Sequence, residues 1–302
     1  MNATWQWFLP ECVIFATELP DPWKRSCAFV RFDRNLETDS PNQSVMTRFP
    51  SYLLLITLSV LLSGCGAAVL PEGYVASQGH AAFREMKKKE RVSTNPRYNA
   101  MVKRVAGRLA EVSDIELPKT EWEFVVFESD AINAFALPGG KVGVYTGLIE
   151  LVDSDDELAA VIGHEIAHVA FRHGNKRMSQ HLGILAGGIL LDSSMRKKDR
   201  TDRQMARLGY GVGSQLLVAL PYGRKQETEA DERGLMYAAL AGYDPRASVT
   251  FWQKMKKQSK SRPPEFLSTH PDTDNRIDFL ESKMDQAMRI YRQGRAARGV
   301  PP

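Results

Sequence analysis

The chain has 302 residues, of which 43% are hydrophobic and 25% are charged, and its formal net charge is +4. This composition is ordinary for a globular protein and excludes a disordered, collagen-like or multi-span membrane protein. Lysine and arginine are spread along the chain rather than gathered in a stripe with interleaved aromatic residues, so nucleic acid is not an expected partner.

The cysteines limit the kind of metal site that the chain can build. Cys12, Cys27 and Cys65 are all of them, and none follows residue 65. The folded body therefore has neither a disulfide framework nor a thiolate metal site, and any metal that it binds must use histidine and carboxylate ligands.

Residues 46–65 have the parts of a bacterial lipoprotein signal peptide. An initiator-like Met46 and an arginine precede an apolar run over residues 52–62, which is shorter than the roughly 20 residues of a spanning helix and fits a signal-peptide core. The run ends in Leu62-Ser63-Gly64-Cys65, which resembles the lipobox, where the chain is cut before the cysteine and the sulfur receives a lipid. We expect a lipid on Cys65 and, because Gly66 follows instead of Asp, a place on the periplasmic side of the outer membrane. The alternative is a buried helix that ends in a Gly-rich turn.

These features set the expected domain boundaries. A signal peptide normally begins close to the start of a chain, so we expect residues 1–45 to be a gene-start artefact, with a genuine extra segment as the alternative. Residues 46–64 are then the signal peptide, residues 65–93 a linker with helical character, residues 94–292 the folded domain, and residues 293–302 a disordered tail.

Helices and a small sheet are predicted in the first half of the folded part. Two helical stretches follow each other between residues 74 and 112, and Thr94-Asn95-Pro96 opens the second. Residues 122–128 are aromatic and branched and predict a strand. After the turn at Pro138-Gly139-Gly140, residues 141–145 alternate as an edge strand does.

The second half is predicted to be helical. A long helix over residues 153–180 begins with a capping box made by Ser154 and Glu157. Residues 182–220 are Gly-rich and apolar around a charged loop, in pieces too short to span a bilayer. Further helices are predicted over residues 222–241, 246–258 and 272–293. The expected fold class is α+β and mostly helical.

The sequence His164-Glu165-Ile166-Ala167-His168 lies in the middle of the long predicted helix. Residues four apart lie one turn apart on the same face, so both imidazoles can bind one ion at the Zn–N distance of about 2.0–2.1 Å. Glu165 is rotated by roughly 100° but can still reach a water on that ion and take its proton. We therefore expect one zinc ion per subunit. The alternative is that each histidine is an ordinary core or surface residue.

A catalytic zinc ion has three protein ligands and one open position. Glu227 and Asp231 are four apart and share one face of a predicted helix, so we assign Glu227 as the third ligand and Asp231 as the acceptor that orients a ligating histidine. Glu229 points away and is expected to pair with Arg233 at the surface. The alternative is that these acids form a solvated helix face.

Taken together, the motifs resemble those of the HtpX-like and prenyl-protein-protease-like zinc metallopeptidases, which include periplasmic lipoproteins and the mitochondrial Oma-type enzymes. The resemblance covers roughly residues 95–285. It rests on residues 133–140 (NAFALPGG), 164–168, 227–231 and 242–245, and on Ser268-Thr269-His270-Pro271 with Arg276.

This resemblance implies a zincin-like metallopeptidase domain, with the small β-sheet beside the HExxH helix, from the periplasmic lipoprotein branch. The ExxxD motif of the family matches Glu227 and Asp231. The resemblance also implies that His270, with Arg276, stabilises the oxyanion or reaches into the site. The remaining histidines, His80, His173 and His181, are expected to be structural or surface residues off the metal face.

The predicted function is a zinc-dependent endopeptidase that cleaves unfolded or misfolded envelope proteins. Its substrate is expected to enter as an extended strand and pair with the edge strand at residues 141–145. The main alternative is a chaperone or assembly factor for outer-membrane proteins, with a latent metal site and the outer-membrane assembly machinery as partner. A third hypothesis, a structural zinc protein, requires His270 to complete a fourth bond to the metal.

Overall fold

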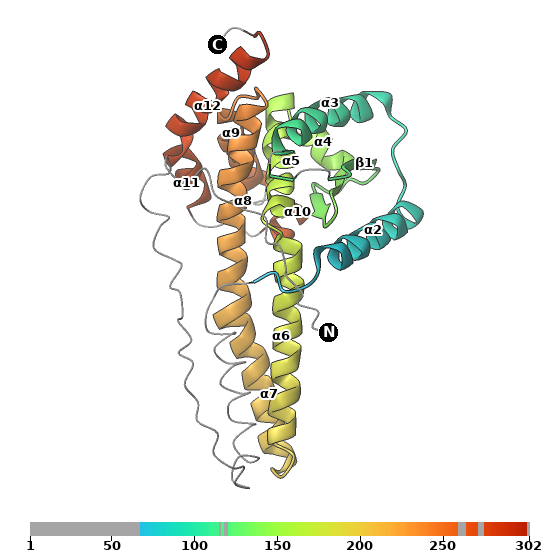
Figure 1. Cartoon of the computed structure of the whole chain (residues 1–302), viewed down its shortest axis with the longest axis vertical. Coiled ribbons are helices and arrows are strands. Elements are labelled where there is room, and N and C mark those ends of the chain that lie inside the picture. Colours follow the sequence, from blue (N-terminus) through green and yellow to red (C-terminus); the bar gives the residue numbers. More distant parts are fainter. Residues whose placement is uncertain (1–66, 115, 118–119, 259–263, 271–274, 301–302) are drawn as a thin grey trace, which may run out of the picture. The chain divides into compact units, whose positions relative to one another are not determined.

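The computed structural model in Figure 1 describes residues 67–114, 116–117, 120–258, 264–270 and 275–300. The predictions for residues 1–66, including the signal peptide and the lipid on Cys65, lie outside this part of the chain. The described part is mostly helical with a small three-stranded sheet, a zincin-like arrangement, as the sequence predicts. Its helices are α2 (Glu72–Lys89), α3 (Pro96–Ser113), α4 (Thr146–Leu151), α5 (Asp155–Ala170), α6 (His173–Ser194), α7 (Arg200–Ser214), η2 (Gln215–Ala219), α8 (Leu220–Leu240), α9 (Arg246–Gln258), α10 (Glu265–Thr269), α11 (Arg276–Ser282) and α12 (Met284–Ala297).

The two N-terminal helices form where the sequence predicts them. The side chain of Asn95 caps α3 by accepting hydrogen bonds from the backbone N–H groups of Arg97 and Tyr98. Helix α2 packs on the sheet, with Gly79 so close to the Pro138 carbonyl that a Cβ there would lie 2.1 Å from its oxygen. Residues 72–89 are therefore packed against the domain.

The sheet has the strand order β1-β3-β2, so β3 is its central strand. Strand β1 (Glu123–Phe127) runs parallel to β3 (Lys141–Tyr145), and β2 (Ala134–Leu137) runs antiparallel to it. The prediction that residues 141–145 form an edge strand is wrong. All five residues of β3 are buried. Lys141 can be buried with them because its ammonium group donates to the carbonyl of Glu121 at 2.8 Å.

The free edge of the sheet belongs to β2. The outer side of β1 is covered by the segment before α3, where Ser93 N–H donates to the Val126 carbonyl and Glu128 N–H donates to the Arg91 carbonyl. Strand β2 lies beside α5, and within the described chain it has a strand partner on one side only. Sequence analysis missed β2 because its four residues, Ala-Phe-Ala-Leu, show no polar alternation.

The long helix predicted over residues 153–180 is two helices. Helix α5 begins at the predicted cap, where the Ser154 hydroxyl accepts from Glu157 N–H, although the Glu157 carboxylate returns to Asp153 N–H instead of Ser154. It ends at Ala170, because Arg172 has a left-handed backbone with φ 55°. A non-glycine residue in that region interrupts the helix, and α6 starts at His173.

Residues 182–220 are helical except for the turn at residues 195–199, and these helices were not predicted from the sequence. Helices α6 and α7 lie side by side (Figure 1). They approach closely at Gly187, where an added Cβ would lie 2.1 Å from the Tyr210 hydroxyl, and that hydroxyl donates to the Ile184 carbonyl at 2.8 Å. None of the helices in the described ranges is long and apolar enough to cross a bilayer.

The C-terminal helices differ from the prediction at their ends. Helix α9 has the predicted bounds. The helix predicted over residues 272–293 is divided at Lys283 into α11 and α12, and α12 continues to Ala297, so residues 293–297 are helical rather than disordered.

Helix α5 is the centre of the core. Its apolar residues include the fully buried Leu158, Ile162 and Ile166, each contributing about 1.5–3 kcal/mol by leaving water. The helix packs most extensively on α8. Gly163 and Gly234 face each other at this contact, and a Cβ on Gly234 would lie 2.6 Å from the His164 nitrogen. The two glycines thus let α8 approach the HExxH segment closely.

Candidate metal centre

Helices α5 and α8 together place the predicted metal ligands around one point. His164 and His168 lie one turn apart on α5 and are 4% and 5% exposed, with their Nε2 atoms 3.0 Å apart. Glu227 on α8 brings its carboxylate to the same place, with Oε2 3.3 Å from His164 Nε2 and Oε1 3.5 Å from His168 Nε2. Donor atoms on a tetrahedral zinc ion are roughly 3.3 Å apart, as follows from its bond lengths. The spacing of these three donors therefore fits a zinc ion.

His270, the cap residue after α10, supplies a fourth donor. Its Nδ1 lies 3.0 Å from Glu227 Oε2 and 3.2 Å from His164 Nε2. One ligand atom from each of the four residues, His164, His168, Glu227 and His270, lies within 4.8 Å of the others, and all four residues are buried. The ring of His270 is held by stacking on Phe266, with centroids 4.5 Å apart.

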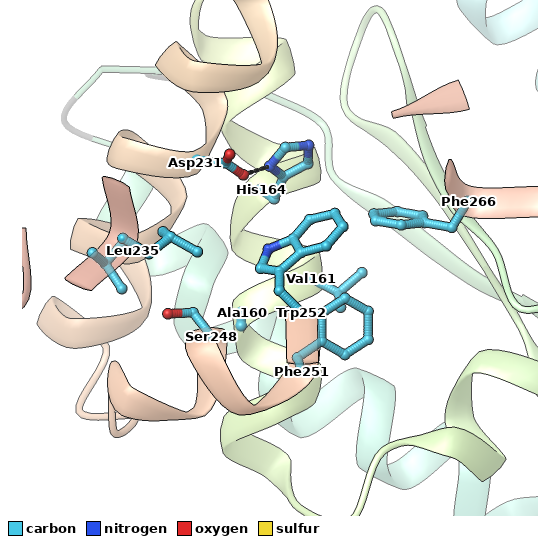
Figure 2. Close-up of a pocket in the computed structure, with 10 residues that line it drawn as sticks. Ala160, Val161, His164, Asp231, Leu235, Ser248, Phe251, Trp252 and Phe266 are labelled. Atoms are coloured by element: carbon cyan, nitrogen blue, oxygen red, sulfur yellow. Dashed lines mark ion pairs between the residues drawn. The ribbon is translucent and has the colours of Figure 1, made fainter. Parts of the chain in front are cut away.

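The outer nitrogen of His164 contacts Asp231, one turn along α8 from Glu227. Its Nδ1 lies 2.9 Å from Asp231 Oδ1 (Figure 2). A carboxylate in this position fixes the ring so that Nε2 is directed to the metal. The apolar rings of Trp252 and Phe266 pack beside the same histidine (Figure 2), with centroids 6.4 and 6.2 Å from its own.

Arg276 joins the two carboxylates of α8. Its Nε donates to Asp231 Oδ2 at 2.6 Å and its Nη2 to Glu227 Oε2 at 3.0 Å. The guanidinium is buried over the ring of Trp252, 3.9 Å from the centroid. Removing one partner from such a buried group of charges typically costs about 3–5 kcal/mol. Arg276 therefore holds Glu227 and Asp231 in place.

The outer nitrogen of His168 contacts His173, which the sequence analysis treated as remote from the metal. The two Nδ1 atoms lie 2.8 Å apart, and His173 Nε2 lies 3.1 Å from Glu229 Oε2. The predicted Glu229–Arg233 pair is wrong, since Arg233 instead donates to Glu116 at 2.7 Å. A chain from the half-buried Glu229 carboxylate through the buried His173 thus supports the second predicted ligand, His168.

The other two histidines lie away from the cluster. His80 on α2 is within 3.2 Å of the Gly139 carbonyl in the turn before β3, and His181 on α6 is exposed.

The electrostatics of the site call for a cation. Burial by itself lowers the pKa of His164, but hydrogen bonds to Asp231 and Glu227 outweigh it and raise that pKa to about 9. Burial likewise opposes the charge on Glu227, yet its hydrogen bonds with His164 and His270 lower its pKa. The carboxylates thus draw positive charge onto His164, whereas burial and the neighbouring His164 lower the pKa of His168. A divalent ion would supply the same compensation to the carboxylates.

Glu165 lies at the inner end of a cleft. It is 1% exposed, burial raises its pKa, and its Oε1 is 3.3 Å from His270 Nε2. The cleft has a volume of about 210 Å³ and is lined by Glu165, His168 and His270 on one side and by Phe135 and Ala136 of β2 on another. A buried carboxyl with a raised pKa beside a metal site is suited to accept and return a proton.

Comparison with known proteins agrees with this geometry. The sequence pattern of Peptidase family M48 matches residues 96–284. The mitochondrial metalloendopeptidase OMA1 of Homo sapiens is 36% identical over 220 residues, which are 70% of this chain and 41% of that protein. The OMA1 of Arabidopsis thaliana is 35% identical over 191 residues, 63% of this chain and 37% of that protein. The beta-barrel assembly-enhancing protease of Escherichia coli (strain K12) is 29% identical over 223 residues, 72% of this chain and 45% of that protein. The matched part thus spans about half or less of the length of these relatives.

Proposed function

The chain belongs to peptidase family M48, and we propose that it is a zinc-dependent endopeptidase that cleaves unfolded or misfolded proteins of the cell envelope. The observation that carries the proposal is the meeting of His164, His168 and Glu227 at one buried point beside Glu165 and an open cleft. A lipid on Cys65 would hold the enzyme at the periplasmic face of the outer membrane.

The chemistry divides between the metal and the side chains around it. Zinc bound by His164, His168 and Glu227 would polarise the scissile carbonyl and make the attacking water more acidic. Glu165 accepts the proton of that water and then donates it to the leaving amine, a shuttle that its burial favours. Asp231 acts through His164 as a positioning residue. Arg276 also acts by positioning, because two of its nitrogens are already bound to Asp231 and Glu227.

The substrate would pair with β2, not with residues 141–145 as the sequence analysis expected. Tyr145 N–H donates to the Asn133 carbonyl, so in the antiparallel register the hydrogen-bonded pairs are 133–145, 135–143 and 137–141. The N–H and C=O groups of Ala134 and Ala136 therefore point away from β3. Ala136 lines the cleft that ends at Glu165. An extended peptide that adds to this edge would bring its backbone past the metal site.

His270 decides whether the metal site has an open position for water and substrate. Three protein ligands leave a zinc ion one open position, whereas four close it. The Nδ1 of His270 lies among the other donors, so we propose that it fills the fourth position at rest and moves away when substrate binds. If it never moves, the site is structural, as the third hypothesis from the sequence requires.

A chaperone or assembly role for outer-membrane proteins is a second candidate. The E. coli relative is named as a beta-barrel assembly-enhancing protease, which makes outer-membrane proteins a reasonable class of client. Complementation separates the roles, because Glu165→Gln would restore growth of a strain lacking the protein only if cleavage is dispensable.

The deciding experiment is metal analysis with cleavage of denatured casein by the purified full chain. We expect about one zinc per chain, loss of cleavage with a chelator and recovery with added zinc. Glu165→Gln should keep zinc and lose at least about 10²-fold in rate. The exposed Glu281 serves as the matched control, and Glu281→Gln should cleave like the parent. A Glu165→Gln variant that cleaves normally would remove the proposed base.

A further inference from the structure

Helices α6 and α7 form a hairpin that leaves the core of the protein. We call residues 181–220 the hairpin. The buried residues of α6, His173, Asn175 and Ser179, all precede it, and α7 has no buried residue. Its two helices meet at Tyr210 and Gly187 and through the Arg207–Asp192 ion pair, and the residues of the hairpin whose burial is described are all half-buried or exposed. Helices of this kind usually gain their stability by packing an apolar face against something else.

Each side of the hairpin carries a row of exposed apolar side chains. Helix α6 has Leu182, Leu185 and Ile189, and the other side has Met205, Leu208, Val212, Leu216 and Leu220. Every one of them is about half exposed or more, and Ile189 is 70% exposed. The spacings of three and four residues put each row on one helix face. Monomeric proteins seldom expose contiguous apolar surface of this extent without a partner.

The charges of the hairpin identify the chemistry of that partner. Residues 181–220 contain six Lys or Arg and three Asp, a net charge of +3, and no Glu. Five of the basic residues, Arg196, Lys197, Lys198, Arg200 and Arg203, are grouped at or next to the turn between the helices. Amphipathic helices with apolar rows and basic residues bind the boundary between anionic headgroups and acyl chains.

The start of the described chain lies at the base of the same hairpin. Val69 N–H donates to the Ser179 hydroxyl at 3.1 Å, and Leu70 is tied to Asn175 by hydrogen bonds through both its N–H and its C=O. Cys65 precedes Val69 by four residues, which span at most about 14 Å. A lipid on Cys65 would therefore enter the bilayer close to the base of α6.

We propose that the hairpin lies on an anionic lipid bilayer, with its two apolar rows inserted at the headgroup boundary and its basic turn on the headgroups. The part of this proposal that involves Cys65 rests on the lipid anchor of the proposed function. The apolar rows and the charge support the proposal independently of that anchor. Docked in this way, the hairpin would fix the orientation of the cleft relative to the membrane.

Vesicle flotation of the full chain carrying Cys65→Ser tests the hairpin without the lipid. Vesicles of phosphatidylethanolamine and phosphatidylglycerol should bind this protein, and vesicles of phosphatidylcholine should bind it several-fold less. Adding Leu208→Gln and Val212→Gln should weaken binding about tenfold or more. The matched control is Tyr74→Gln with Val300→Gln, two exposed apolar residues outside the hairpin, which should bind within about twofold of the parent.

Three results would overturn the proposal. The first is that the Cys65→Ser protein binds neither kind of vesicle. The second is that the Leu208→Gln/Val212→Gln variant binds as well as its parent. The third is that the parent sediments as a dimer, binds no vesicle, and becomes a monomer with these two substitutions. The third result would mean that the two apolar rows bind a second copy of the chain and not a bilayer. Circular dichroism and casein cleavage check that the variant folds, since the hairpin is no part of the catalytic site. Vesicle binding should survive Glu165→Gln, so a failure of the endopeptidase proposal and a failure of this one are separable.

Discussion

The Nδ1 atoms of His168 and His173 lie 2.8 Å apart. On one continuous helix, five residues would turn the two side chains about 140° away from each other. The end of α5 at Ala170 and the left-handed Arg172 remove that separation and return His173 to the side of the metal site. His173 then reaches Glu229 with its other nitrogen. Since burial lowers the pKa of His173 to about 3, its ring is neutral. It can accept a hydrogen bond from His168 Nδ1–H at one nitrogen while donating one to Glu229 from the other.

His173→Ala should therefore weaken zinc binding about 10- to 100-fold, because it removes the hydrogen bond that orients His168. Competition with a fluorescent zinc chelator measures this directly and does not depend on cleavage. The exposed His181 on the same α6 helix gives the control, and His181→Ala should leave the affinity unchanged. Equal zinc affinity in both variants would show that His173 is only a core residue.

The sequence could predict those parts of the site that depend on spacing within one helix. His164 and His168, and likewise Glu227 and Asp231, are four apart, and the structure brings both pairs together. The contacts between elements were harder to predict. The position of His173 depends on a helix break at Arg172, whereas the nearest glycine, Gly174, lies two residues later, inside α6.

The sheet and the hairpin also depend on contacts between elements that the sequence does not reveal. The strand character of β3 follows from its residues, but its central place depends on pairing with β2, a four-residue run with no period of its own. No helix was predicted for the Gly-rich residues 182–220. Their glycines instead admit a bulky neighbour, as Gly187 does for Tyr210.

Lys87→Met should make the free energy of unfolding depend less on pH in the acidic range. Lys87 on α2 pairs with Glu123 at the start of β1, and this hydrogen bond lowers the pKa of Glu123 from its usual 4.5. The pair therefore stabilises the fold above about pH 4.5, and that contribution disappears as the pH falls through the lowered pKa. Because both side chains are about a third exposed, the loss at pH 7 should be only about 0.5–1 kcal/mol.

Urea unfolding of Lys87→Met and the parent at pH 7 and pH 3 measures the effect. The difference in the free energy of unfolding should be present at pH 7 and smaller at pH 3. Lys88→Met is the control, since Lys88 pairs with the exposed Glu85 of its own helix. A difference that persists unchanged at pH 3 would mean that Lys87 acts through packing on Phe83.

Ala136→Pro should impair substrate binding with little effect on the metal. Its N–H points away from β3 in the observed register, so proline removes a donor to the substrate without breaking the sheet. The expected result is a fall of about tenfold or more in kcat/KM for an extended peptide, with zinc content unchanged. Ala136→Val keeps the N–H and should lose much less. Similar losses in the two variants would point to side-chain crowding in the cleft and away from strand pairing.

His270→Ala decides how the fourth donor is used. The three other donors stay in place, so the variant should retain zinc, with some loss of affinity. Casein cleavage should be as fast as in the parent or faster, because no ring has to leave the fourth position before water and substrate can occupy it. Zinc content and initial rates, measured on the same preparation, check both statements. If zinc stays and the rate falls 100-fold or more, His270 must stabilise the oxyanion instead, since losing one donor to a developing negative charge has an effect of that size.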